Sequence, residues 1–269
     1  MYALDFEYDG RRLSDMGFII CDFKSPSGAD TISAGSTIAF NTVSQHSGKR
    51  YGLSSTKYED CIETTFHICK HPDINDDMEI KEDEYRKLLR WLNRHEFLRF
   101  RVLNEYEISR ACYYDASFNI SRIEINKKLY GLELQMQTNR PFGYGDVVHY
   151  EWNLNTSPAQ VKVIDISDEI GYTYPDMVIT CSSSGDLEIC NTTLNRTMTI
   201  KNCNAGESIR IDGLAQIITS TNSDHAIYND FNFQFMRIGN TPRNNENIIT
   251  VNMPCKLEIS YAPIIKGAP

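Results

Sequence analysis

The stretch Phe6–Ile20, FEYDGRRLSDMGFII, indicates how the fold begins. Leu4, Phe6 and Tyr8 alternate with polar residues, which predicts a half-buried strand, and Asp9-Gly10 is a turn signal. A second apolar run, Gly17–Cys21, follows within a few residues. The stretch therefore predicts that a small β-element opens the fold.

Alternation with a period of two recurs along the rest of the chain, and it predicts half-buried strands. The stretches that carry it are Phe118–Ile125, Tyr130–Met136, Ile209–Ile211, Phe231–Phe235 and Leu257–Tyr261. The first of these changes parity at Arg122, where one extra residue would form a β-bulge. We therefore expect a mainly β protein.

A helix is predicted only over Asp83–Phe97, DEYRKLLRWLNRHEF. Its apolar residues recur at helical spacing, and its acidic first turn and basic last turn suit the helix dipole. The apolar positions are Tyr85, Leu88, Leu89 and Leu92. The acidic run Asp73–Glu84 comes directly before a basic window, Tyr85–Arg101. We interpret the pair as an acidic lead-in and the solvent-exposed face of one helix.

Length and composition limit the protein class. The 269 residues, 41% hydrophobic and 23% charged, suit an ordinary globular chain of two domains. A net charge of −9 disfavours nucleic-acid binding. Apolar runs such as Gly17–Cys21 are far shorter than the roughly 20 residues that cross a bilayer, so no membrane insertion is expected. The opening MYALDFEYDGRR lacks the features of a signal peptide, so we expect a protein that is not exported.

The best domain boundary is Thr138–Asp146, TNRPFGYGD, where an alternating stretch ends in Pro and Gly. It divides the chain into an N-terminal domain, residues 1–143, and a C-terminal domain, residues 144–269. Turn signals recur at short intervals in the second part, which is typical of an antiparallel β-sandwich.

The common catalytic and nucleotide-binding motifs are absent from the sequence. His67 and His71 flank Cys69, but the segment predicts a strand that would hold the two histidines too far apart for one metal ion. The acidic residues from Asp73 to Glu79 lack the spacing and the Gly of a calcium loop. We assign no catalytic, cofactor-binding or metal-binding residue, and we expect neither a cofactor nor enzymatic activity.

The eight cysteines form no C-x-x-C motif and are interpreted mostly as buried free thiols. Trp152 has two interpretations, which the sequence leaves open. It could stack on a sugar, or it could cover an edge of the sandwich.

The order of these features resembles the distal tail (Dit) proteins of long-tailed phages and prophages of Gram-positive bacteria. In the N-terminal half, the similar stretches are Phe6–Ile20, Trp91-Leu92, Phe97–Phe100, Tyr113-Tyr114 and Arg140–Tyr144. In the C-terminal half, Tyr174–Ile179, Asn191–Ile200, Gly206–Gly213, Phe231–Asn240 and Cys255–Pro263 resemble the galectin-like sandwich of that family.

The resemblance implies a structural virion protein. The N-terminal domain would form a homohexameric ring, a hub that joins the tail tube protein to the baseplate or to a tail-tip or tail-associated protein. The galectin-like C-terminal domain would offer a platform for receptor-binding proteins. The implied location is the tail tip, after assembly in the bacterial host cytoplasm.

Two alternatives accompany this expectation. Ser33–Tyr58, which contains Gly35, Gly48 and Gly52, is either a long hairpin that reaches a neighbouring subunit or an ordinary surface hairpin. The C-terminal sandwich is either a docking platform or a carbohydrate-binding module that recognises host cell-wall saccharide, because a fold does not carry its function with it. Trp152 lies outside Phe231–Cys255, which disfavours a galectin-type sugar site.

Overall fold

The computed structural model describes residues 5–23, 36–43, 53–103 and 112–267. The chain forms two compact units, one of residues 1–145 with residues 265–269, and the other of residues 146–264. The sequence places its boundary between residues 143 and 144, two residues earlier, and it gives no sign that residues 265–269 return to the first unit. No helix in the described part is long and apolar enough to cross a membrane.

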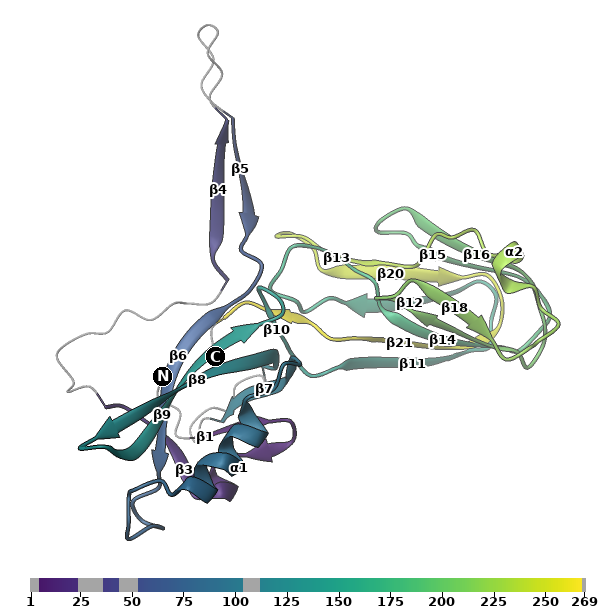
Figure 1. Ribbon diagram of the computed structural model, residues 1–269. Helices are drawn as coiled ribbons and strands as arrows, with labels where there is room; N and C mark the ends of the chain where they lie inside the picture. Colours follow the sequence, from purple (N-terminus) through teal and green to yellow (C-terminus); the bar gives the residue numbers. More distant parts are fainter. Residues whose placement is uncertain (1–4, 24–35, 44–52, 104–111, 268–269) are drawn as a thin grey trace, which may run out of the picture. The chain divides into compact units, whose positions relative to one another are not determined.

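The first unit is built on a seven-stranded antiparallel sheet (Figure 1). In spatial order the strands are β2 (Arg11–Arg12), β1 (Asp5–Tyr8), β7 (Leu98–Leu103), β8 (Tyr114–Ile125), β9 (Lys128–Thr138), β6 (Glu63–Lys70) and β3 (Phe18–Cys21). The short 3-10 helix η1 (Ser14–Met16) and strand β10 (Gly143–Tyr144) complete the unit together with the helix and hairpin described next.

Helix α1 (Glu82–Leu92) packs on an aromatic core. Its Trp91 ring stacks on Phe6 with the ring centroids 5.7 Å apart, and the Trp91 indole N–H donates a 3.0 Å hydrogen bond to the Tyr8 carbonyl oxygen. The helix ends five residues before the predicted Phe97. The chain leaves the helix at Asn93, whose side-chain amide donates to the Phe118 carbonyl oxygen at 3.4 Å.

Strands β4 (Ile38–Val43) and β5 (Leu53–Tyr58) form a hairpin outside the seven-stranded sheet (Figure 1). Within the described residues, the two strands pair only with each other. The hairpin expected within Ser33–Tyr58 is therefore present. The three glycines of this segment, Gly35, Gly48 and Gly52, lie outside the described residues, as does Leu4.

The second unit is an antiparallel β-sandwich, which confirms the predicted architecture. One sheet has the order β11 (Val148–Leu154), β21 (Cys255–Tyr261), β14 (Asp176–Cys181), β17 (Ser208–Asp212) and β18 (Ile217–Ser220). The facing sheet has the order β12 (Ala159–Ile164), β20 (Glu246–Val251), β15 (Gly185–Asn191) and β16 (Arg196–Cys203). The smaller elements are β13 (Gly171–Thr173), β19 (Ile238–Asn240) and α2 (Ile227–Asp230). Strand β22 (Ile264–Ile265) spans the boundary between the two units.

The period-two pattern predicts strands correctly where a sheet buries alternate side chains. Leu132, Leu134 and Met136 of β9 are at most 1% exposed. The pattern fails at Phe231–Phe235, which is irregular and not a strand, because Phe233 has a positive φ and the Asn232 side chain accepts a hydrogen bond from the Gln234 amide. The bulge expected at Arg122 is not there, because the pairing of β8 with β9 is regular through Arg122. The register shift lies between Ile123 and Glu124, and its extra residue is Tyr130 of β9.

Candidate functional site

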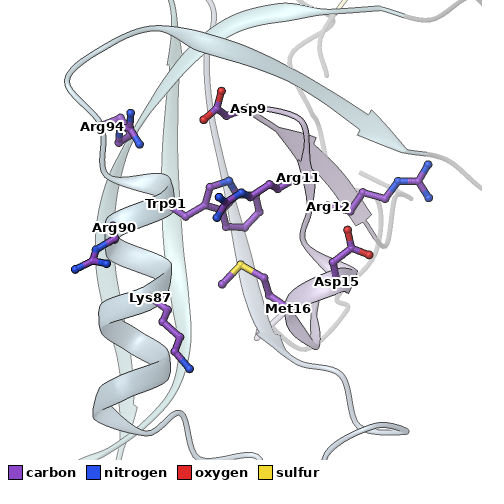
Figure 2. Close-up of a pocket in the computed structure, with 9 residues that line it drawn as sticks. All are labelled: Asp9, Arg11, Arg12, Asp15, Met16, Lys87, Arg90, Trp91 and Arg94. Carbon is purple, nitrogen blue, oxygen red and sulfur yellow. The ribbon is translucent and has the colours of Figure 1, made fainter.

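A groove in the first unit lies between α1 and the β1–β2 hairpin, with a volume of about 570 Å³ (Figure 2). We call it the basic groove. Its lining residues are Asp9, Arg11, Arg12, Asp15, Met16, Lys87, Arg90, Trp91 and Arg94. In Figure 2, Trp91 and Met16 lie between the helix and the hairpin, with Arg11 beside Trp91.

Local rules of helix and hairpin geometry place these side chains. Lys87, Arg90 and Arg94 are three and four residues apart and so share one side of α1 or its immediate extension. Asp9 and Gly10 both have a positive φ, as a two-residue type I′ turn requires, and this turn sets Arg11 and Arg12 opposite β1. Residues more than 70 positions apart in the sequence therefore line one groove.

The basic groove is a positive region on an acidic protein. It has five basic and two acidic side chains, which gives it a charge of +3 and leaves −12 on the rest of a chain whose net charge is −9. Lys87 and Arg94 reach carboxylates of their own helix region only at 3.8 and 4.0 Å. Arg11, Arg12 and Arg90 form no ion pair with a residue that the structure describes. The groove thus suits an anionic group.

A second candidate surface is the β4–β5 hairpin. Phe40 is 74% exposed and Ile38 is 44% exposed. The base of the hairpin is anchored within its own unit, because Tyr58 packs edge-on against Phe142 with the ring centroids 4.8 Å apart, and the Ser36 hydroxyl donates to the Pro141 carbonyl oxygen. An exposed phenylalanine on a two-stranded sheet marks a surface that a partner can cover.

The histidines that the sequence analysis weighed for metal binding do not form a site. His67 faces Glu133, with 3.4 Å between Nε2 and the carboxylate, and His71 accepts a hydrogen bond from the Asp73 amide. The described residues contain one geometric cluster of possible ligands, His149, Glu151 and Glu258. Lys256 neutralises both of its carboxylates, at 3.0 and 2.7 Å, so the cluster does not favour a cation.

The second unit contains a buried polar cluster around Glu207. The carboxylate accepts hydrogen bonds of 2.5 Å from the Ser220 hydroxyl and 2.5 Å from His225 Nδ1. His225 Nε2 faces Asp230 at 3.4 Å. Ser220 donates to the carboxylate and not to the histidine, so the cluster lacks the pairing of nucleophile and base that acyl transfer needs. Its geometry indicates a structural role.

Electrostatics support a charged state for this cluster. Burial alone would raise the pKa of Glu207, but hydrogen bonds from Ser220 and His225 hold it below its ordinary value. Burial likewise opposes the charge on His225, but the bond to Glu207 and the nearby charges raise its pKa above the ordinary value. Both pKa shifts therefore favour the ionised forms, so the contact between Glu207 and His225 has the character of a buried ion pair.

The structure also shows where Trp152 and the cysteines lie. Trp152 packs against the core of the second unit and stacks on Tyr150, with the rings 4° from parallel and their centroids 5.4 Å apart. This arrangement agrees with an edge-covering role. None of the eight cysteines is in a disulfide, and three of them are buried and five half-buried.

Sequence reasoning missed Arg11 and Arg12 as members of a site. It found the basic window on the helix but took it for a solvent-exposed face alone. The available signal was the Arg-Arg pair directly after the Asp-Gly turn, since residues that follow such a turn lie beside the first strand of the hairpin.

Comparisons with known proteins agree with this architecture. A family profile described as the phage tail protein N-terminal domain matches residues 1–140, and one described as the phage tail C-terminal domain matches residues 142–261. A search of curated proteins finds no significant match. Among solved structures, the chain is similar to the Dit (gp 19.1) protein of phage SPP1, described as a paradigm of the hub adsorption apparatus in phages that infect Gram-positive bacteria.

The structural similarity to SPP1 Dit extends over 96% of this chain and 98% of that one, with a TM-score of 0.65 at 13% sequence identity. At this identity the match concerns the fold. The two family profiles together cover almost the whole sequence. The chain therefore belongs to the phage tail protein family that these profiles describe, and it has the fold of a distal tail (Dit) protein.

Proposed function

We propose that the chain is the subunit of a hexameric ring, a hub at the tail tip that joins the tail tube to the baseplate or tail-tip proteins. The family supports a structural role in a phage tail. The similarity to a hub protein spans both units, so neither unit is an addition to an unrelated fold. On this proposal the first unit builds the ring during assembly in the bacterial host.

The observation that carries the proposal is the β4–β5 hairpin. A two-stranded sheet is at best marginally stable alone in water. On the β4–β5 hairpin, Phe40 exposes 74% of its surface. A neighbouring subunit that covers Phe40 would remove this apolar surface from water. Such a contact joins different surfaces of two copies of the chain, and contacts of this kind can close into a ring.

The second unit is proposed as the docking platform for receptor-binding proteins. Several of its large apolar side chains are exposed, among them Leu214 at 77% and Tyr172 at 58%. A saccharide-binding role has less support, because a galectin-type site needs an accessible stacking tryptophan and Trp152 is stacked on Tyr150.

Light scattering over a range of concentrations tests the ring. The purified chain is expected to reach about six times the 30.8 kDa mass of one chain. Phe40→Asp should shift the mass towards the monomer, because it places a charge in the proposed subunit contact. Leu214→Asp, which changes an equally exposed apolar residue of the second unit, should leave the mass unchanged. A hexamer that tolerates Phe40→Asp as well as Leu214→Asp would exclude the hairpin as the ring contact.

A further inference from the structure

We propose that the basic groove of one subunit binds the loop Pro72–Asp77 of a second copy of this chain. We call this loop the acidic knob. The inference rests on the proposed ring, since it names a contact between its subunits, and it is separate from the contact proposed for the β4–β5 hairpin.

The basic groove has cations without matching anions. Arg11, Arg12 and Arg90 are exposed, and each is free of ion pairs to the described residues. The side chain of Trp91 is buried and forms part of the groove wall, because α1 packs it on Phe6. An occupant of this groove therefore needs carboxylates for the rim and an apolar side chain for the region of Trp91 and Met16.

The acidic knob has this combination. Asp73 and Asp76 are exposed, and neither carboxylate forms an ion pair with a residue in the described ranges. Asp77 is already neutralised within its own chain by Lys81 at 2.9 Å. Between the two free carboxylates stands Ile74, which exposes 65% of its surface. An apolar side chain between two unpaired acids is the complement of the groove.

The acidic knob is also held in one conformation. The His71 amide donates to the Gly17 carbonyl oxygen at 2.9 Å, and the Asn75 side-chain amide donates to the Gly17 and His71 carbonyl oxygens at 3.0 Å each. The amides of Ile74 and Asn75 close the turn on the His71 carbonyl oxygen. Because the loop is ordered before it binds, little conformational entropy is lost in the contact.

A second copy is the occupant that the charges favour. Every copy carries one groove and one knob on the same unit, so a chain of identical contacts can form between different surfaces and close on itself. The groove carries +3, whereas the remainder of each copy carries −12, so an approaching subunit is attracted to the groove in particular.

A charge exchange tests this pairing in the full chain. The groove variant is Arg11→Glu with Arg12→Glu, and the knob variant is Asp73→Lys with Asp76→Lys. Each should weaken self-association by about tenfold or more in sedimentation velocity at low salt, since like charges then oppose each other. An equimolar mixture of the wild-type chain with either variant should assemble less than the wild type alone. The combined variant, which exchanges the signs, should recover most of the association.

Lys201→Glu with Arg243→Glu is the matched control for the groove variant, because it makes the same charge change at exposed residues of the second unit. It should associate like the wild type. If the wild type forms the ring and the groove variant assembles equally well, the inference is overturned while the ring stands. Equal weakening by the control variant would also overturn it, because net charge would then explain the loss.

A wild-type chain that stays monomeric would count against the ring, and a second measurement then decides the inference. Carbodiimide joins carboxylates to amines in contact, and Lys87 is the amine of the basic groove. In a concentrated mixture of isotope-labelled and unlabelled chains, the inference expects an intermolecular cross-link from Asp73 or Asp76 to Lys87. Absence of that cross-link, with others detected, would overturn the inference.

Discussion

At the scale of single residues, the buried pair of Glu207 and His225 ties the segment before α2 to the sandwich. Each side chain is about 1% exposed, so each depends on the other for its charge. Ser220, Asn204 and Asp230 also face the pair. The Cys203 thiol is close enough to affect the pKa of His225. The pair therefore links the stability of the second unit to pH.

The pH dependence has a definite sign. The pKa of His225 is raised by folding, so its contribution is complete below the ordinary value of 6.5 and is lost as pH rises through the folded pKa. The pKa of Glu207 is lowered from 4.5, so its contribution is complete above that value and is lost as pH falls through the folded pKa. We expect the free energy of unfolding of the second unit to fall as the pH rises from 6 to 8.

Urea unfolding followed by tryptophan fluorescence measures this effect. Trp91 and Trp152 are the two tryptophans, one in each unit, so a Trp91→Phe background reports on the second unit alone. His225→Gln should lower the free energy of unfolding by roughly 3 kcal/mol, because it leaves Glu207 buried without its cation, and it should flatten the profile between pH 6 and 8. His149→Gln, at an exposed histidine, serves as the control. A profile in His225→Gln as steep as that of the background would contradict the assignment.

At the scale of elements, Glu84 joins α1 to the sheet. Its carboxylate accepts a 2.7 Å hydrogen bond from the Lys81 amide at the start of the helix. The same oxygen lies 2.9 Å from Nζ of Lys70, a lysine on β6 that is only 5% exposed. One side chain thus caps the helix and neutralises a buried cation.

Replacement of this carboxylate should destabilise the first unit strongly. Glu84→Ala is expected to lower its free energy of unfolding by about 3 kcal/mol, since Lys70 is left buried and unpaired. Glu82→Ala, which removes an exposed pair with Arg86 on the same helix turn, should change it by about 0.5 kcal/mol or less. Urea unfolding in a Trp152→Phe background follows the first unit through Trp91. Equal effects of the two substitutions on the free energy of unfolding would show that the ion pair between Lys70 and Glu84 does not stabilise the first unit.

The elements also show how far sequence can predict this fold. Strands such as β9 and β21 were predictable because each buries one face, so that apolar and polar residues alternate along the sequence. Phe231–Phe235 has the same period without a strand, since the Asn232 side chain and the positive φ of Phe233 turn the backbone. A local hydrogen bond of this kind overrides the pattern and is invisible to it.

The site was less predictable than the fold. The helical half of the basic groove was visible as Lys87, Arg90 and Arg94, three basic residues at helical spacing. Its other half is Arg11 and Arg12, which reach the helix only because β1 pairs with β7 and Trp91 of α1 packs on β1. Contacts between residues so far apart in sequence depend on the complete sheet, so local patterns do not encode them.

At the scale of the whole molecule, the chain returns to the first unit after it completes the second. The hydroxyl of Tyr114, a residue only 2% exposed, donates a 3.1 Å hydrogen bond to the Gly267 carbonyl oxygen. Nζ of Lys266 lies 5.3 Å from the centre of the Tyr58 ring, at the base of the β4–β5 hairpin. The C-terminal segment therefore supports the unit that we propose builds the ring.

Deletion of residues 265–269 should lower the free energy of unfolding of the first unit by about 1 kcal/mol or more, because the buried Tyr114 hydroxyl loses its carbonyl acceptor. The second unit, whose core residues all lie between 154 and 261, should keep its stability. Trp91 and Trp152 report the two transitions separately in Trp152→Phe and Trp91→Phe backgrounds.

Tyr114→Phe distinguishes the hydrogen bond from a general effect of truncation. In the intact chain the substitution leaves the Gly267 carbonyl near the surface, where water can replace the hydroxyl, so its effect should be small. In the truncated chain it removes a hydroxyl that has lost its carbonyl acceptor, and it should restore part of the lost stability. If the truncation instead lowers both transitions equally, or if Tyr114→Phe restores nothing, then residues 265–269 stabilise the chain by some other contact than the one to Tyr114.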